Sequence, residues 1–385
     1  QMGDTADSVR PGVKVEVTRE AVGVVAIISP WNFPTATAVW KIAPALAFGN
    51  TVIWKPANLT PASAVALAEI IHRQGMPEGT FNLLLGGGSS VGDALINSTD
   101  IDAVSFTGSV PTGRKVAAAT APNFIRCQLE MGSKNALVIA DDADLQVAID
   151  AAVAGAFGGS GQKCTASSRL IVMDGIHDAF VKGVIAKMKT LKVGHALDDG
   201  IFMGPVVDDK QLASNMDWIE KAKQSGANLA FGGERLEMPH DGYYMSPTLF
   251  TETDNSWDIN QEEVFAPLAC VLRVKNLEEA IAMTNDTRFG LTGGIITQSL
   301  RSSAMFKEQV QAGCVMVNLA TAGTDYHVPF GGRKQSSFGP REQEICQRIQ
   351  YHRQNRLSKS VLETLLISML ATIDATGCKH ALNGK

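Results

Sequence analysis

A single cysteine in a glycine-dense stretch is the first candidate for chemistry. Residues 158–169 read GGSGQKCTASSR, which places Cys164 directly after Lys163 and before small hydroxyl residues. An accessible thiol is a nucleophile when nearby positive charge favours the thiolate, and glycines let backbone amides approach a substrate and face an oxyanion. The alternative is a small buried packing residue. The stretch predicts a nucleophilic loop that needs partners elsewhere in the chain.

A candidate partner is the carboxylate of Glu130. It lies in the stretch CQLEMGSKN of residues 127–135, at the end of an apolar segment and just before a turn. A solvated surface glutamate is the alternative interpretation. A carboxylate partly removed from water has a raised pKa and can act as a general base.

A candidate anion site is the stretch FTGSVPTGR of residues 106–114, which contains Gly108 and Ser109. It follows an apolar run and opens a predicted helix, so it offers a hydroxyl group and free amides to a phosphate. The run GGGSSVG of residues 86–92 lacks the spacing Gly-x-Gly-x-x-Gly. We predict a flexible loop there.

The elements that must position these residues alternate between strands and helices. Hydrophobic patterns predict strands at residues 13–18, 22–28, 51–54, 81–85 and 103–106, with helices at 40–48 and 63–73. Such alternation is typical of βαβ units and a Rossmann-like parallel sheet, which binds ligands beyond the carboxyl ends of its strands. A second α/β unit is predicted from strands at 170–173, 270–274 and 293–297 and helices at 144–155, 177–191 and 277–286.

Composition narrows the function classes. The chain has 385 residues, long enough for two domains, and a net charge of -5 that does not indicate nucleic-acid binding. Its 6 cysteines form no Cys-x-x-Cys pair, so neither a metal site nor a disulfide framework is predicted. A polar N-terminus and the lack of an apolar run of about 20 residues favour a cytoplasmic protein without a membrane partner. Residues 361–373 are predicted to form a short helix.

Several motifs occur in one order that is typical of a known family. They are WNFP at residues 31–34, KPA at 55–57, FTGS at 106–109, LEMG at 129–132, GQKC at 161–164, EEVFAP at 262–267 and PFGGRK at 329–334. Over residues 13–343 the chain resembles the NAD(P)-dependent aldehyde dehydrogenases. The resemblance implies an interface arm at residues 1–20, a Rossmann-like cofactor-binding domain at 21–132 and an α/β catalytic domain at 133–334, followed by a mostly unmatched segment at 335–385.

The resemblance also implies a role for each site residue. Cys164 attacks the aldehyde carbon, the oxyanion lies against the Asn32 amide and the backbone N–H of Cys164, and Glu130 activates the water that hydrolyses the resulting thioester. The cofactor is NAD or NADP. Contacts with it are implied for Trp31, Lys55, Asn58, Gly108, Ser109, Glu263 and Phe265. For Phe265, simple core packing is the alternative.

Departures from the family pattern bear on specificity and assembly. Asn58 stands where many NAD-preferring relatives have a glutamate, which leaves the choice between NAD and NADP open. Residues 8–13 and 325–334 resemble α-ketoglutaric semialdehyde dehydrogenases and imply an aldehyde with a distal carboxylate. The family is homo-oligomeric, but its upstream cofactor-domain helices are not matched and the similarity is lost after Gln343. We therefore expect strand 13–18 to lack a partner and the chain to assemble poorly.

Two other classes stay open at this point. A cysteine-dependent acyltransferase would need a histidine paired with Cys164, and the 7 histidines lie in no recognisable partner motif. An inactive or poorly folded relative would keep the site residues but lose packing at its ends. Reduction of a nicotinamide cofactor by a semialdehyde discriminates among these interpretations.

Overall fold

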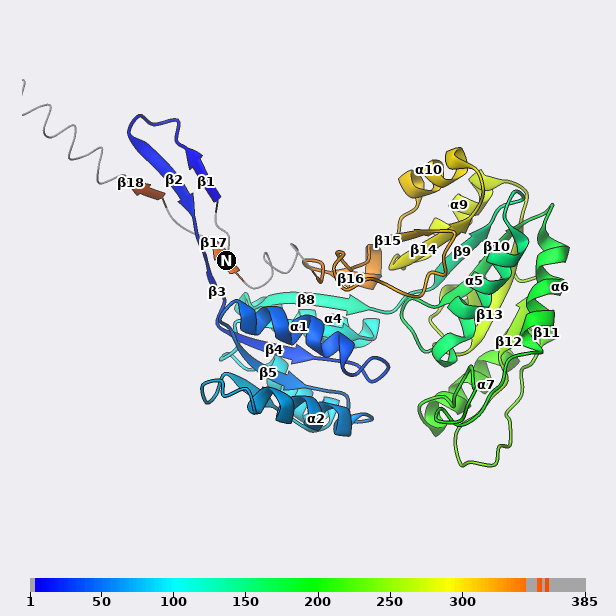
Figure 1. Cartoon of the computed structure of the whole chain (residues 1–385), viewed down its shortest axis with the longest axis horizontal. Helices are drawn as coiled ribbons and strands as arrows, with labels where there is room; N and C mark the ends of the chain where they lie inside the picture. The colour runs from blue at the N-terminus through cyan, green and yellow to red at the C-terminus, as the bar shows by residue number, and fades with distance from the viewer. Residues whose placement is uncertain (1–3, 344–351, 355–356, 360–385) are drawn as a thin grey trace, which may run out of the picture.

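The computed structural model describes residues 4–343, 352–354 and 357–359. Two α/β units lie side by side, each built around its own sheet, and a narrow β-arm extends from the first unit (Figure 1). The arm contains β1 (Asp4–Asp7) and β2 (Val13–Val17), which pair antiparallel. The sequence-predicted α/β architecture with a Rossmann-like first unit is confirmed.

The first unit has a sheet in the order β16-β8-β7-β4-β5-β6. Its parallel strands are β4 (Val24–Ile28), β5 (Thr51–Lys55), β6 (Phe81–Leu83), β7 (Ala103–Gly108) and β8 (Arg126–Met131). The short β16 (Ser337–Phe338) adds antiparallel to β8. Strand order reverses between β4 and β7, and ligands of such sheets bind at the carboxyl ends beside this switch point.

Helices connect these strands and cover the sheet. They are α1 (Ala36–Ala47), α2 (Pro61–His72), α3 (Asp93–Ile96) and α4 (Val110–Thr120). Val25, Ile27, Val52 and Trp54 are fully buried and pack with apolar residues of α1 and α2, as expected for strands covered by helices. The predicted flexible loop at residues 86–92 is wrong. Residues Gly88–Gly92 form a helical turn that leads directly into α3.

The second unit has a larger sheet in the order β11-β12-β13-β10-β9-β14-β15. The strands are β9 (Asn135–Ile139), β10 (Ser167–Met173), β11 (Asn228–Phe231), β12 (Thr248–Thr251), β13 (Leu268–Val274), β14 (Thr292–Ile296) and β15 (Cys314–Val317). The antiparallel pair in this sheet is β11 with β12, and the other pairs are parallel.

Helices cover both faces of this second sheet. They are α5 (Leu145–Phe157), α6 (His177–Met188), α7 (Asp209–Gln224), α8 (Asp258–Gln261), α9 (Leu277–Asn285) and α10 (Leu300–Gln309). Successive residues of β9 face opposite sides. Leu137 packs with α5 and α6, whereas Val138 packs with α9 and α10. No helix in the described part of the chain combines the length and apolar character needed to cross a membrane.

The arm corrects an expectation about strand pairing. β17 (His352–Gln354) pairs antiparallel with β3 (Arg19–Ala21), and β18 (Leu357–Lys359) pairs antiparallel with β2. Strand 13–18 was expected to lack a partner because the C-terminal segment has few aromatic residues. Ladder pairing uses backbone N–H and C=O groups, which basic residues also supply. The predicted helix at residues 361–373 lies outside the described residues.

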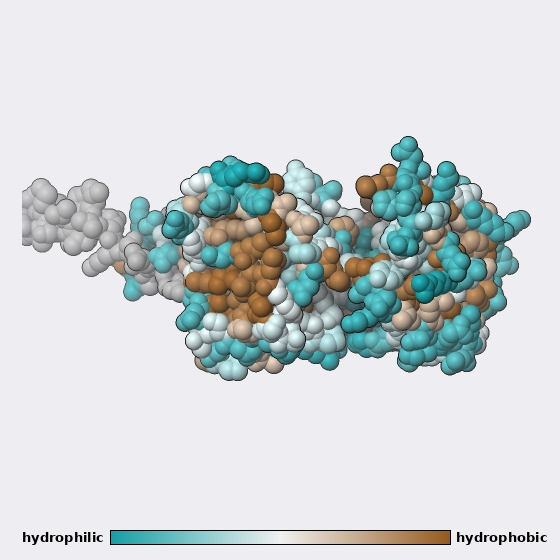
Figure 2. All heavy atoms as spheres, turned by 90° about the horizontal axis from the view of Figure 1, so that it is seen from below, coloured by the Kyte–Doolittle hydropathy of each residue, from teal (hydrophilic) through white to brown (hydrophobic). Residues whose placement is uncertain are grey.

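An apolar patch lies on the first unit. Figure 2 shows it as a broad hydrophobic area on one face, and exposed apolar side chains on and beside α2 include Leu59, Val65 and Ile70. Large exposed apolar patches favour association. Because β2 is paired, the prediction that the chain assembles poorly no longer has the support of an unpaired strand.

Candidate active site

A cavity of about 250 Å³ joins the two units at the carboxyl ends of β4, β7 and β8. Most of the sequence-predicted site residues line it. They are Trp31, Asn32, Gly108, Ser109, Cys164, Glu263 and Phe265. Trp31 and Asn32 follow β4, and Gly108 and Ser109 follow β7, so the switch point of the first sheet forms one wall. The predicted residues Glu130, Lys55 and Asn58 do not line this cavity.

The loop that carries Cys164 has an unusual backbone. Gly159, Ser160 and Gly161 have φ values of 63, 56 and 64°, in the left-handed region. A Cβ atom at Gly161 would lie 2.0 Å from the carbonyl oxygen of Ala266, so only glycine allows this close approach. Ser160 donates from its hydroxyl to the carbonyl oxygen of Gly204 at 2.8 Å. These contacts fix the loop against the neighbouring segment that carries Phe265.

Two asparagines hold the same loop from opposite sides. Asn32 donates from Nδ2 to the carbonyl oxygen of Gln162 at 2.9 Å. Asn135 donates from Nδ2 to the carbonyl oxygens of Cys164 and Ala166, at 2.8 and 2.9 Å. Asn135 also accepts from the backbone N–H of Thr292 at 3.0 Å. The sequence alone predicts no role for Asn135, because its hydrogen-bond partners lie about 30 and 160 residues away.

The surroundings of Cys164 favour the protonated thiol over the thiolate. Burial raises its pKa to about 12, with further contributions from the carboxylates of Glu263 and Glu130. Lys163 was expected to favour the thiolate through its positive charge. Its Nζ instead donates to the carbonyl oxygen of Ala154 at 3.3 Å, and burial lowers its own pKa to about 8. Burial and the two carboxylates therefore raise the pKa of the Cys164 thiol by more than the charge of Lys163 lowers it.

Glu130 is buried in a polar network beside the cavity. Its Oε2 accepts from the hydroxyl of Ser337 at 2.6 Å, and its Oε1 accepts from Nε2 of Gln128 at 3.4 Å. Burial raises the pKa of Glu130 to about 8, partly offset by Ser337, Lys41, Arg341 and Gln128. The raised pKa agrees with the predicted properties of a general base.

Lys41 joins this network from α1. Its ammonium forms an ion pair with the carboxylate of Glu342 and donates to Oε1 of Gln128 at 3.4 Å. Burial lowers the pKa of Lys41 to about 7, partly offset by Glu130. Lys41 and Glu342 are not predicted from the sequence, since nothing in the local pattern links residues that are 301 positions apart.

The residues of the cavity suit a dinucleotide. The hydroxyl oxygen of Thr107 is buried and has no hydrogen-bond partner among the described residues. Ser109 caps α4, a helix of 11 residues whose first N–H groups can bind a phosphate. A Cβ atom at Gly132 would lie 1.8 Å from Oε2 of Glu263, so the glycine leaves room for this carboxylate.

Glu263 and Phe265 form the opposite wall. Glu263 accepts from the backbone N–H of Ser133 at 3.1 Å, and burial raises its pKa to about 7. Phe265 packs edge-on against Trp31 with ring centroids 5.5 Å apart. Two polar walls and an aromatic pair are features expected around a nicotinamide ribose and ring, and the residues therefore fit the implied cofactor.

Lys55 and Asn58 lie beyond the cavity, at the end of β5. Lys55 is buried, its Nζ donates to the carbonyl oxygen of Pro56 at 2.9 Å, and burial lowers its pKa. A Cβ atom at Gly92 would lie 3.7 Å from the Lys55 side chain, so the helical turn at Gly88–Gly92 packs on this lysine. Asn58 is exposed.

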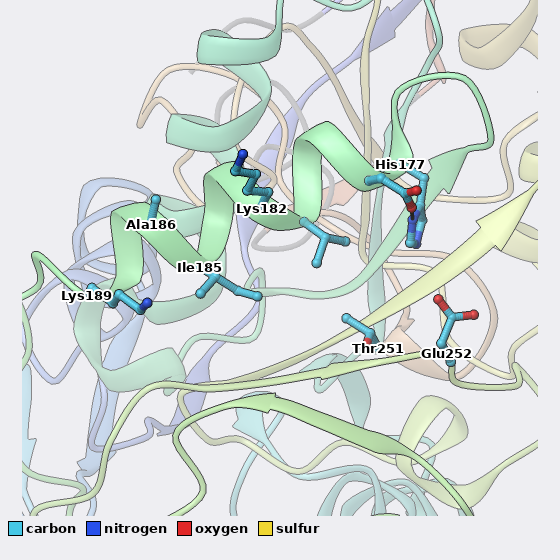
Figure 3. A pocket seen from close by; sticks show the side chains of 9 residues that line it. His177, Lys182, Ile185, Ala186, Lys189, Thr251 and Glu252 are labelled. Carbon is cyan, nitrogen blue, oxygen red and sulfur yellow. Dashed lines mark hydrogen bonds and ion pairs between the residues drawn. The ribbon is translucent and has the colours of Figure 1, made fainter.

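A second cavity, of about 640 Å³, lies away from these residues, along α6 (Figure 3). Val181 and Ile185 of α6 line one side, and Thr251 at the end of β12 and the following Glu252 line the other. It is larger than the cavity at Cys164 but contains none of the predicted site residues. Size alone therefore does not identify the reactive site, and we place the chemistry in the smaller cavity.

A Rossmann-like unit that meets a cysteine loop at its switch point defines a dinucleotide-dependent enzyme. The sequence profile of the aldehyde dehydrogenase family matches residues 1–354. The α-ketoglutaric semialdehyde dehydrogenase of Bacillus subtilis is 41% identical over 343 residues, which cover 89% of this chain and 70% of that protein. The 2,5-dioxopentanoate dehydrogenase of Saccharolobus solfataricus is 40% identical over 336 residues, covering 87% and 70%. The chain belongs to the aldehyde dehydrogenase family.

Solved structures agree with this assignment. A betaine aldehyde dehydrogenase from Staphylococcus aureus, in complex with NAD+, aligns with a TM-score of 0.90 at 35% identity over 93% of this chain and 71% of that one. An NADP-dependent enzyme from E. coli aligns with a TM-score of 0.90 at 34% identity over 93% and 74%. The predicted family of NAD(P)-dependent aldehyde dehydrogenases is confirmed. The family match extends to residue 354, a short way past the predicted boundary at Gln343.

Proposed function

We propose that this chain oxidises a semialdehyde with a distal carboxylate, such as α-ketoglutaric semialdehyde, to the corresponding acid through a thioester on Cys164. The observation that carries the proposal is the shared cavity of Cys164, Asn32 and Glu263 at the switch point of the first sheet. The substrate class is supported by the relatives from B. subtilis and S. solfataricus, at 41% and 40% identity.

Asn32 and the Cys164 loop stabilise the developing oxyanion. The Cys164 thiol gives up its proton to solvent water, and attack by the resulting thiolate on the aldehyde carbon places a negative charge on the carbonyl oxygen. One hydrogen of the Asn32 amide is used by the carbonyl oxygen of Gln162, at 2.9 Å. The other hydrogen is free to donate to the oxyanion together with the backbone N–H of Cys164, and the first bond keeps the amide beside the loop.

The cofactor is NAD or NADP. When bound, its oxidised nicotinamide supplies the acceptor for the two electrons and the hydrogen that leave the aldehyde carbon. Ser109 and the start of α4 would hold the pyrophosphate, Glu263 the nicotinamide ribose, and Trp31 and Phe265 would enclose the ring. Lys55 and Asn58 would contact the adenosine ribose.

Glu130 takes a proton from the water that hydrolyses the thioester. Its pKa of about 8 makes it a usable base near neutral pH. The network of Lys41, Gln128 and Glu342 connects it to buried polar groups that can accept or return the proton. The products are the carboxylic acid and the free Cys164 thiol.

A cysteine-dependent acyltransferase is disfavoured because no histidine is among the described residues that line the cavity of Cys164. The direct test measures reduction of NAD and NADP by the purified chain with α-ketoglutaric semialdehyde, and with betaine aldehyde for comparison. A higher kcat/KM for the semialdehyde supports the proposal. Preference for betaine aldehyde would contradict the substrate assignment, and transfer of an acyl group without cofactor reduction would contradict the reaction class.

A further inference from the structure

Glu130 lies near Cys164 but is not among the residues that line its cavity. A general base must come within about 2.6–3.2 Å of the water proton that it removes, directly or through one further water. The thioester forms on Cys164, which lines the cavity, whereas Glu130 does not line it. Both carboxylate oxygens of Glu130 are bonded in the network next to the cavity. A carboxylate oxygen can accept more than one hydrogen bond, so these bonds do not block its chemistry, but a move of the carboxylate into the cavity breaks at least one of them.

The shorter of the two bonds comes from Ser337. Its hydroxyl donates to Oε2 of Glu130 at 2.6 Å, compared with 3.4 Å for the bond from Gln128. When Glu130 is ionised this bond is charge-assisted, and such bonds are roughly twice as strong as neutral ones. Ser337 is thus the strongest hydrogen-bond partner of Glu130 among the described residues.

The geometry around Ser337 fixes the direction of this bond. The backbone N–H of Gly332 donates to Oγ of Ser337 at 2.5 Å, which leaves the hydroxyl proton for Glu130. Ser337 and Glu130 are also register partners across β16 and β8. The serine therefore sits on a paired backbone directly opposite the carboxylate, and its hydroxyl is oriented by a second donor.

We propose that Ser337 is a positioning residue that holds the Glu130 carboxylate outside the Cys164 cavity while the thioester forms, and that hydrolysis requires this hydrogen bond to break. Held there, the carboxylate cannot deliver water to the cavity before the thioester exists. The inference rests on the proposed function, since it assigns the base of the same reaction a resting position.

Ser337 also donates to the ionised form of Glu130, so it affects when the base is charged. The other titratable groups that act on Glu130 are Lys41 on α1, Arg341, Cys314 on β15 and Cys164, with Glu342 paired to Lys41. All of these remain when Ser337 is changed. Loss of the hydroxyl therefore has two consequences: the base ionises at higher pH, and once ionised it is free to enter the cavity.

The test is Ser337→Ala, with Ser337→Thr as the variant that keeps a hydroxyl. Hydrolysis of the acyl-enzyme is followed by single-turnover kinetics across pH. We expect the midpoint of the curve of hydrolysis rate against pH to lie roughly one pH unit higher in Ser337→Ala than in wild type. This is the size expected from the loss of one charge-assisted bond. Its rate at the high-pH plateau should equal or exceed that of wild type, and Ser337→Thr should restore the midpoint.

Ser336→Ala is the matched control. The Ser336 hydroxyl donates to the carbonyl oxygen of Gly132 at 2.9 Å and accepts from the N–H of Gly290 at 3.0 Å, without contacting Glu130. This variant should lose thermal stability without a shift of the pH midpoint. If Ser337→Ala behaves in the same way, with a lower plateau and an unchanged midpoint, Ser337 is merely structural and the inference is overturned.

A measurement without turnover separates this inference from the proposed function. The carboxyl group of Glu130 can be titrated in the infrared difference spectrum between each protein and its Glu130→Gln counterpart. A raised midpoint in Ser337→Ala supports the bond to Ser337 even in preparations without activity. Equal midpoints contradict it, whereas absence of cofactor reduction in wild type contradicts the proposed function itself.

Discussion

The Nδ2 atom of Asn32 lies 2.9 Å from the carbonyl oxygen of Gln162, two residues before Cys164. This bond joins the end of β4 in the first unit to the cysteine loop of the second. It links two residues that are 130 positions apart, and so holds the predicted oxyanion donor beside the loop of the predicted nucleophile. The chemistry therefore depends on how the two sheets meet, as well as on the residues of either motif.

Replacement of Cys164 by alanine should remove aldehyde oxidation, with a loss of at least about 10³-fold in kcat. Cys127→Ala and Cys314→Ala should retain it, because neither thiol lines the cavity. Steady-state cofactor reduction measures all three. An equal loss in the three variants would refute the assignment of Cys164.

Hydrolysis of the thioester should accelerate as pH rises through about 8, because Glu130 is protonated below its raised pKa and becomes a base above it. Glu130→Gln should remove this dependence and slow hydrolysis by about 10²–10⁴-fold. Rapid-mixing kinetics should then show a burst of reduced cofactor that is followed by little turnover. Normal turnover in Glu130→Gln would show that another group is the base.

Asn58→Glu should shift cofactor preference towards NAD. A carboxylate can accept hydrogen bonds from both ribose hydroxyls and repels a 2′-phosphate. The difference in binding free energy between NAD and NADP should therefore change by on the order of 1–3 kcal/mol. Titration of NAD and NADP into wild type and variant measures it. Asn123→Glu, which adds the same charge at another exposed position of this unit, is the control. A wild type that already excludes NADP as strongly as Asn58→Glu would contradict the argument.

Asn135→Ala should destabilise the chain by roughly 1–3 kcal/mol, because buried carbonyl oxygens of the Cys164 loop lose their donor. Asn82→Ala is the matched control, since its exposed amide also donates to two carbonyl oxygens, those of Val52 and Gly79. Denaturant unfolding measures both. Equal small effects would show that Asn135 does not hold the loop.

The sequence predicts the site well where one motif carries the signal. The glycine-rich loop of Cys164 and the helix start at Ser109 have local causes, in backbone conformation and capping, and Cys164 and Ser109 line one cavity. The resting position of Glu130 has no such local cause. It depends on Ser337, Gln128 and Lys41, which meet only when β16 and α1 pack beside β8.

The arm shows the same limit. The pairing of β18 with β2 joins residues from the two ends of the described chain. Propensity gave no reason to expect it, because pairing depends on backbone geometry as well as on residue type. Only the tertiary structure shows that β2 is paired with β18.

The proposed reaction requires that a thioester forms on Cys164. The most direct measurement quenches Glu130→Gln with acid after mixing with cofactor and α-ketoglutaric semialdehyde, and locates the added mass by peptide mass spectrometry. We predict one acyl group per chain on the peptide that contains Cys164, in proportion to the amount of cofactor reduced. Cofactor reduction without a covalent adduct, or an adduct on another cysteine, would contradict it.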